Sequence, residues 1–294
     1  MINKKKIKDF NSIGFIVIKK LLSKKEIDKV FSQMDSVLNT VLKFNKIKYK
    51  KEMSIKKKYF LLKKKKPILK THFYDCIRIM DSFNNIVNSK KVTKVMKKLL
   101  NTDTLFITNN RMKTDHRLEP NNIALHQELF NISTDSAILF CPFVKVSKNT
   151  GGIMAIPGSH KYGHLKWKGS QIGTRSKVSP KNLPSSQIGV VEKILNNEEK
   201  IDYKNPIVKK LIKKENFIFP TLNPGDALIF KTMTLHGSTP YKGKKIRWVL
   251  NANYHRPYKT PYLLQENFIG DKNTLELNRP MRIPYNMPKW YEWI

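Results

Sequence analysis

Residues Asn149-Thr-Gly-Gly-Ile-Met-Ala-Ile-Pro-Gly-Ser-His160 carry the strongest indication of the fold. Their apolar run, residues 152–156, is short, and it lies between Gly151 and the pair Pro157-Gly158. Short apolar runs between glycine and proline turn signals are typical of buried β-strands, because a buried helix needs a longer run. The stretch therefore predicts a strand that is followed by a tight turn.

Similar short runs recur from about residue 104 to residue 255, at 105–108, 136–140, 226–230 and 247–251. Helical patterns come before this region, and strand patterns fill it. Helices first and many short strands later predict a mainly β protein with some α, built as a sandwich or barrel with an N-terminal helical buttress.

The first part of the chain, residues 1–103, is helical by pattern. Ser23 and Glu26 form a predicted capping box, in which the serine accepts from the third amide and the glutamate reaches back. The apolar residues that follow have helical spacing: Ile27, Val30, Phe31, Met34, Val37, Leu38, Val41 and Leu42. Another helix is expected to begin at a cap on Asp81 or Ser82 and to run to Leu100.

Charge is high and uneven. The 294 residues include 57 Lys and Arg against 22 Asp and Glu, a formal net charge of +35, and only eight of the cations are arginine. Residues 43–70 hold thirteen lysines and one acid, Glu52, whereas 121–160 hold two cations. A lysine-biased solvated surface accounts for this pattern, and so does attraction to an anionic partner such as a charged substrate, a membrane surface or nucleic acid. The scarcity of arginine makes nucleic acid an unlikely partner.

Several protein classes are excluded by composition. A hydrophobic fraction of 40% is enough for a core, and two cysteines, Cys76 and Cys141, rule out a disulfide scaffold or a cysteine-rich zinc module. No apolar run reaches the roughly 18 residues of a membrane span, and the N-terminus lacks the apolar region of a secretory signal. We expect a cytoplasmic protein; its oligomeric state is not indicated.

Three polar residues form a candidate metal site. If 125–129 is a strand, His126 and Glu128 point to the same side, and His236 on a distant strand adds a second imidazole. Two nitrogens and one carboxylate form the facial triad of non-haem Fe(II) oxygenases, although Mn, Co or Ni also suit these donors. Arg247, on the next strand, and Ser238 can hold a carboxylate near the metal. A ligand that chelates iron at one end and carries a carboxylate at the other is 2-oxoglutarate, with O₂ as the further co-substrate.

These motifs together resemble the phytanoyl-CoA dioxygenase family of Fe(II)/2-oxoglutarate-dependent oxygenases. Residues 149–160 are similar to its Asn-Gly-x-Leu…Pro-Gly-Ser-His segment, 126–128 to its metal-binding His-Gln-Asp, and 224–247 to its distal histidine, serine and arginine. The resemblance implies a double-stranded β-helix, a cupin-like jelly roll, with His126, Glu128 and His236 on iron. It also implies that Arg247 and Ser238 bind 2-oxoglutarate. The family usually has Asp where Glu128 stands.

Other residues are weaker candidates. Arg111 and Lys113 could bind the other end of 2-oxoglutarate or an anionic substrate, and exposed ion pairs would explain them equally well. Gln127, Trp167 and Asn251 are candidate substrate contacts. His160 is expected to stabilise its loop.

The whole chain, 1–294, is expected to be one oxygenase domain, with a jelly-roll core at 104–255, a lid-like insertion at 161–216 and an extended tail at 256–294. The predicted function is Fe(II)- and 2-oxoglutarate-dependent hydroxylation of an unactivated C–H bond in a small, possibly anionic molecule. The alternatives are a jelly-roll binding protein with a weak or dead metal site and an oxygenase that acts on nucleic acid.

Overall fold

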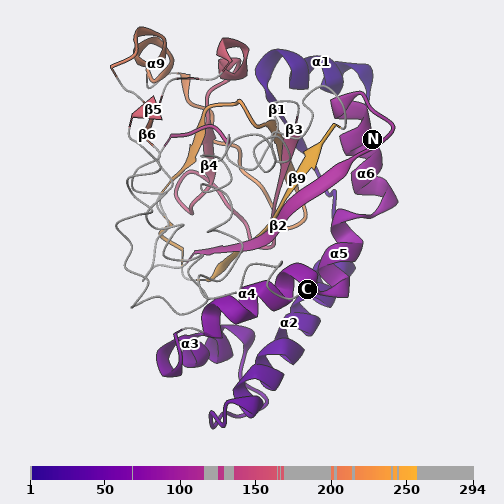
Figure 1. Ribbon diagram of the computed structural model, residues 1–294, viewed down its shortest axis with the longest axis vertical. Coiled ribbons are helices and arrows are strands. Elements are labelled where there is room, and N and C mark those ends of the chain that lie inside the picture. The colour runs from indigo at the N-terminus through magenta and orange to yellow at the C-terminus, as the bar shows by residue number, and fades with distance from the viewer. Residues whose placement is uncertain are drawn as a thin grey trace, which may run out of the picture.

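The fold was examined in a computed structural model (Figure 1). It describes residues 2–67, 69–115, 125–128, 136–163, 165, 167–168, 200–201, 204–213, 216–239, 241–243 and 245–256. Most of the predicted insertion at 161–216 and nearly all of the predicted tail at 256–294 lie outside these residues. The lid-like role of the insertion and the single-domain organisation therefore stay predictions.

The helices come first, as the sequence predicts. Their bounds are α1 Lys4–Ile13, α2 Lys24–Phe44, α3 Ile55–Lys65, α4 Leu69–Ile79, α5 Asp81–Val87 and α6 Lys90–Leu100. The capping box is confirmed, because Ser23 accepts from the Glu26 amide while the Glu26 carboxylate accepts from the Ser23 amide. This reciprocal pair satisfies two backbone donors that the first turn of α2 would otherwise leave open.

The predicted helix from 81 to 100 is instead two helices. Met80 occupies the first cap without a side-chain hydrogen bond, and α5 ends at Val87 with Asn88 as its C-cap. Ser89 then caps α6 by accepting from the Val92 amide. The expected cap at Asp81 or Ser82 is therefore wrong, because Met80 occupies the N-cap position. The expected single helix is two helices, because the Ser89 cap starts a new one.

A five-stranded antiparallel sheet forms the centre of the fold. Its strand order is β1-β7-β3-β9-β2. The bounds are β1 Phe15–Ile18, β7 Ala227–Lys231, β3 Ser136–Pro142, β9 Arg247–His255 and β2 Phe106–Asp115. The N-terminal strand β1 thus pairs with β7, more than 200 residues away in sequence.

A second, smaller sheet lies against the first. It contains β4 Ile153–Ala155 and β8 His236–Ser238, which pair antiparallel. Single bridges extend this sheet on both sides, from β8 to His126 and from β4 to Ile218. Two facing antiparallel sheets with N-terminal helices confirm the predicted jelly roll with a helical buttress. The other described elements are a 3₁₀ turn at Ser159–Tyr162, β5 Trp167–Lys168, β6 Lys200–Ile201 and α9 Pro206–Leu211.

Alternation along the strands divides the core into two layers. On β9, Trp248, Leu250 and Tyr254 pack against the helices, whereas Val249 faces the small sheet. All nine residues of β9 are buried, because helices cover one face of the strand and the second sheet covers the other. Figure 1 shows the N-terminal helices along the right and lower sides of the strands, with the α2–α3 hairpin projecting at the bottom, whereas α9 lies at the upper left. Within the described part of the chain, no helix combines the length and apolar composition needed to cross a bilayer.

Candidate metal centre

Three of the predicted site residues meet on the small sheet. His126 and His236 are backbone partners, with N–H···O distances of 2.8 and 3.0 Å in the two directions. Glu128 follows two residues later, and its amide donates to the Thr232 carbonyl at 3.0 Å. Strand pairing therefore places the His236 imidazole on one face with the side chains of His126 and Glu128, which lie more than 100 residues earlier in the sequence.

The reactive atoms of these side chains converge. Glu128 Oε1 lies 3.5 Å from His126 Nε2 and 4.0 Å from His236 Nε2. One ligand atom from each residue lies within 4.8 Å of the others. The two imidazole rings are 4.3 Å apart at their centroids, and both histidines are about 95% buried.

The donor set fits one transition-metal ion. Metal–ligand bonds of about 2.1 Å keep two ligand atoms within about 4.2 Å of each other, and both carboxylate–imidazole distances meet this limit. Two imidazole nitrogens and one carboxylate on one side of an ion leave positions open on the other. Among the described residues, this is the one cluster of three or more His, Cys, Asp or Glu side chains at ligand spacing.

The turn between β7 and β8 orients three residues of the site: Gln127, Glu128 and His236. The Thr232 carbonyl accepts from the Glu128 amide, and the Met233 carbonyl accepts from the Gln127 side chain at 2.8 Å. The Thr234 carbonyl lies 2.8 Å from Nδ1 of His236. Because a carbonyl only accepts, His236 carries its proton on Nδ1, which leaves the Nε2 lone pair directed toward Glu128.

Gln127, which the sequence suggests as a substrate contact, is committed to the protein backbone. Its Nε2 donates to the carbonyls of Gly163 and Met233, at 2.9 and 2.8 Å, and its Oε1 accepts from the Leu165 amide at 2.9 Å. The side chain is 99% buried. Both amide donors are therefore used, and Gln127 ties the segment around residue 165 to the strand that carries two of the triad residues.

Replacing Gln127 by Leu should weaken metal binding without unfolding the protein. Leucine has a similar volume, but it leaves the carbonyls of Gly163 and Met233 and the amide of Leu165 without a hydrogen-bond partner. The position of Glu128 relative to the β7–β8 turn is then less well fixed. We expect affinity for a divalent ion such as Co(II) to fall about 10- to 100-fold, the effect usual for outer-shell partners. Hydrogen exchange at the Leu165 amide should accelerate in the same variant.

Gln33 offers a matched control for this change. It is a glutamine of α2 whose Oε1 accepts from the Ser82 amide at 3.0 Å, remote from the small sheet. Gln33→Leu should leave Co(II) affinity and Leu165 exchange unchanged. If Gln127→Leu also left both unchanged, Gln127 would have no positioning role.

The Pro-Gly-Ser-His segment, residues 157–160, is hydrogen-bonded to the residue before the ligand His236. Ser159 is fully buried; it donates to the Ile156 carbonyl at 2.6 Å and accepts from the amide of Leu235, the residue before His236, at 2.8 Å. His160 Nε2 lies 3.0 Å from the Asn11 carbonyl, which connects the turn to α1. His160 thus stabilises its loop as predicted. Gly14 is required beside it, since a Cβ there would lie 2.5 Å from His160 Nδ1 at a φ of +93°.

Arg247 is a buried cation at the start of β9. Burial lowers its pKa to about 10, so the guanidinium stays charged at neutral pH. Its Cζ lies 5.9 Å from the Tyr241 ring centre, and a Cβ on Gly151 would lie 2.8 Å from its Nη1. Across the sheet its backbone partner is Asp115 of β2. The guanidinium therefore occupies a cradle that only glycine at position 151 leaves open.

Ser238 lies on β8 of the small sheet, near the Gly151 segment that Arg247 approaches. It is two residues beyond His236 on β8, where its partner is Ile153, two residues after Gly151. The structure thus brings the predicted serine and the predicted arginine to neighbouring parts of the fold. Binding of a carboxylate by this pair remains a prediction.

The other candidates are placed by backbone only or lie within the sheet. Arg111 and Lys113 are on β2 opposite Asn251 and Val249, and Trp167 is on β5; the side chains of Arg111, Lys113 and Trp167 lie outside the described residues. Asn251 is buried on β9.

Asn253, which was not singled out from the sequence, is 99% buried, and its amide nitrogen and oxygen have no hydrogen-bond partner among the described residues. Its signal in the sequence is alternation, since it falls four and six residues after Val249 and Arg247 on one strand face. A buried amide without partners costs about 1–3 kcal/mol, which makes Asn253 a candidate for contact with a ligand.

One protein family matches most of the chain. Residues 10–249 match the family described as Phytanoyl-CoA dioxygenase (PhyH). Among curated proteins, no sequence matches significantly.

Similar solved structures include the epimerase SnoN in complex with Fe³⁺, alpha-ketoglutarate and a nogalamycin compound, at a TM-score of 0.56 and 12% identity over 85% of this chain and 81% of SnoN. ThoJ, a non-heme monooxygenase, matches at a TM-score of 0.57 and 14% identity, over 86% of this chain and 77% of ThoJ. EvdO2 from Micromonospora carbonacea var. aurantiaca, complexed with 2-oxoglutarate, matches at a TM-score of 0.52 and 10% identity. The match covers 86% of this chain and 91% of EvdO2. At these identities the likeness establishes the fold alone.

Proposed function

The chain belongs to the phytanoyl-CoA dioxygenase family, and on this premise we propose that it is an Fe(II)- and 2-oxoglutarate-dependent oxygenase. The proposed reaction is hydroxylation of an unactivated C–H bond in a small molecule. The observation that carries the proposal is the convergence of His126, Glu128 and His236, with ligand atoms within 4.8 Å of one another.

The three side chains would hold the metal and leave open positions for small ligands. His236 is already in the tautomer that a ligand needs, because the Thr234 carbonyl fixes its proton on Nδ1. Glu128 supplies the negative charge, and Thr232 fixes its backbone. Bound Fe(II) with 2-oxoglutarate and O₂ supplies the oxidising power for C–H hydroxylation, with succinate and CO₂ as co-products.

Arg247 and Ser238 would hold the distal carboxylate of 2-oxoglutarate. A guanidinium that is 97% buried binds a carboxylate strongly, since little water competes and the planar fork offers two donors. SnoN and EvdO2 have been solved with this co-substrate, which supports the assignment by fold likeness. Arg111 and Lys113, on β2 beside β9, are proposed to bind the other end of the co-substrate or an anionic substrate.

The substrate itself is proposed only by class. Asn251 and Asn253 are buried on the face of β9 that is directed toward the small sheet, and their amide groups are proposed to contact the substrate. Trp167 is proposed to line the substrate pocket. SnoN is an epimerase and ThoJ a monooxygenase, so proteins of this fold catalyse different reactions. We infer that residues of the substrate pocket determine which reaction occurs.

The proposal is tested by metal- and co-substrate-dependent chemistry. Anaerobically purified protein is loaded with Fe(II) and 2-oxoglutarate, and the charge-transfer absorption of the chelate is recorded. Oxygen and fractionated metabolite pools are then added, and succinate is measured above the uncoupled background. We expect the absorption band with wild type, and succinate release that rises with one fraction.

Each alternative has its own result in this experiment. A jelly-roll binding protein with a dead site would give neither the absorption band nor succinate. An oxygenase that acts on nucleic acid would give succinate only with added DNA or RNA. Either result would overturn the proposed function.

A further inference from the structure

A lysine-rich projection lies away from the metal centre. We call residues 43–66 the basic tip: they comprise the end of α2, the connecting loop and α3. The tip contains twelve lysines, no arginine and one acid, Glu52. In Figure 1 it projects beyond the sheets at the lower end of the molecule.

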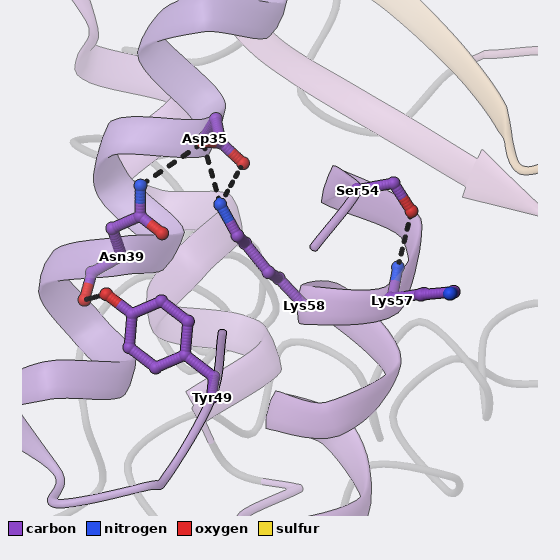
Figure 2. A network of polar contacts seen from close by, with 6 residues as sticks. All are labelled: Asp35, Asn39, Tyr49, Ser54, Lys57 and Lys58. Atoms are coloured by element: carbon purple, nitrogen blue, oxygen red, sulfur yellow. Dashed lines mark hydrogen bonds and ion pairs between the residues drawn. The ribbon is translucent and has the colours of Figure 1, made fainter. Parts of the chain in front are cut away.

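Internal contacts hold the basic tip in a defined conformation. Lys58 is fully buried, and its Nζ donates to both carboxylate oxygens of Asp35 at 2.9 Å (Figure 2). The Tyr49 hydroxyl donates to the Asn39 carbonyl at 3.2 Å, and Lys58 Nζ lies 6.0 Å from the Tyr49 ring centre. These contacts fix the loop and α3 against α2, so the surrounding surface is preorganised.

The carboxylate of Asp35 is engaged in this internal ion pair with Lys58. Asp35 binds Lys58, the buried lysine, and therefore leaves the outer lysines uncompensated by it. Five lysines of the end of α2 and the loop are exposed, and none forms an ion pair with another described residue: Lys43, Lys46, Lys48, Lys50 and Lys51. The projection thus combines high positive charge with a defined shape.

An aromatic side chain stands among these lysines. Phe44 is 86% exposed, the highest value among the exposed large hydrophobic residues that the structure describes. It is the last residue of α2 and sits next to Lys43. An exposed phenylalanine has no folding benefit at this position, but it can enter the boundary between lipid headgroups and acyl chains.

We propose that the basic tip docks on an anionic lipid bilayer. Clustered lysines are attracted to the negative surface of such a membrane, and an aromatic anchor adds apolar burial. Nucleic acid fits less well, because its recognition favours arginine forks and several stacking aromatics, and the tip has no arginine and one protruding ring. Because the tip lies apart from the metal centre, docking and turnover are separable.

The test uses the full chain without metal and vesicles of 70% phosphatidylcholine with 30% phosphatidylglycerol, with pure phosphatidylcholine as reference. We expect cosedimentation with the anionic vesicles only, declining as salt rises. Changing Lys43, Lys46, Lys48, Lys50 and Lys51 together to Gln should lower partitioning at least about a hundredfold, since each lysine at such a surface contributes about fivefold. Phe44→Ser should lower it about tenfold at unchanged charge.

A charge-matched variant controls for the high net charge of the whole chain. Lys4, Lys5 and Lys8 of α1 and Lys94 and Lys97 of α6 are also exposed, and Figure 1 shows both helices in the upper part of the view, away from the basic tip. Changing these five to Gln should alter partitioning by less than about threefold, because they do not face the docked surface.

Three results would overturn the proposal. One is equal loss of binding in the tip variant and the charge-matched variant. Another is the absence of binding to anionic vesicles. The third is binding to duplex DNA or single-stranded RNA that the tip variant alone loses, while vesicle binding is unaffected.

Discussion

Alanine in place of His126 or His236 is expected to abolish stable Fe(II) binding and, with it, 2-oxoglutarate turnover. Each histidine supplies one of three ligand atoms, and a two-ligand remnant holds Fe(II) poorly. Affinity should fall by more than about 100-fold, beyond the range of outer-shell substitutions. Anaerobic titration with Fe(II), followed by the charge-transfer band with 2-oxoglutarate, measures the loss.

Two further variants make this result specific. Glu128→Asp should keep substantial activity, because aspartate is the residue that the family usually has at this position. His160→Gln should keep Fe(II) affinity, since His160 contacts the Asn11 carbonyl and is not part of the triad. Full Fe(II)-dependent turnover in either histidine-to-alanine variant would show that the triad is wrongly assigned.

Arg247→Ala is expected to cost about 2–5 kcal/mol of 2-oxoglutarate binding, the usual loss when one partner of a desolvated charge pair is removed. The guanidinium is almost fully buried at the start of β9, so water cannot replace it well. Fe(II) affinity should stay nearly unchanged, because Arg247 is not one of the ligand residues. Separate titrations with Fe(II) and with 2-oxoglutarate give the two affinities.

The matched control for Arg247 is Arg78→Ala. Arg78 is an exposed arginine at the end of α4, and its removal should change neither affinity. Arg247→Lys should recover part of the co-substrate binding, since it restores charge without the planar fork. Equal loss of Fe(II) and 2-oxoglutarate affinity in Arg247→Ala would indicate that the residue supports the fold, through β2 and Tyr241, and not the co-substrate.

Local signals in the sequence predicted many of the elements and suggested the chemistry of the site. The capping box at Ser23 and the apolar spacing after it specify α2, because caps and helical periodicity depend on neighbouring residues. Strand alternation on β9 separates Trp248 and Leu250, which face the helices, from Arg247 and Asn251. The order His126, Glu128, His236 and Arg247 indicates the donor set without any coordinates.

The sequence was less informative wherever an element could end in more than one place. The apolar residues between 81 and 100 keep helical spacing on either side of the polar stretch 88–91, yet α5 ends at Val87 and α6 begins after the Ser89 cap. The helix start could not be chosen from propensity alone, because most helix stability in proteins comes from packing of the apolar face, here of α5 against α2 and of α6 against β3. The same uncertainty applied to the lysine-rich stretch, where a buried Lys58–Asp35 pair fixes α3.

Only the tertiary structure decided which partners these residues have. His126 and His236 become backbone neighbours through pairing in the small sheet, and the Thr232, Met233 and Thr234 carbonyls then fix Glu128, Gln127 and His236 in turn. Gln127 was predicted as a substrate contact, whereas in the structure its amide is hydrogen-bonded to the backbone at 163, 165 and 233. Residue type and period determine which face a side chain occupies, and they are local properties. Register and long-range pairing determine what that side chain meets, and these depend on how the whole core closes.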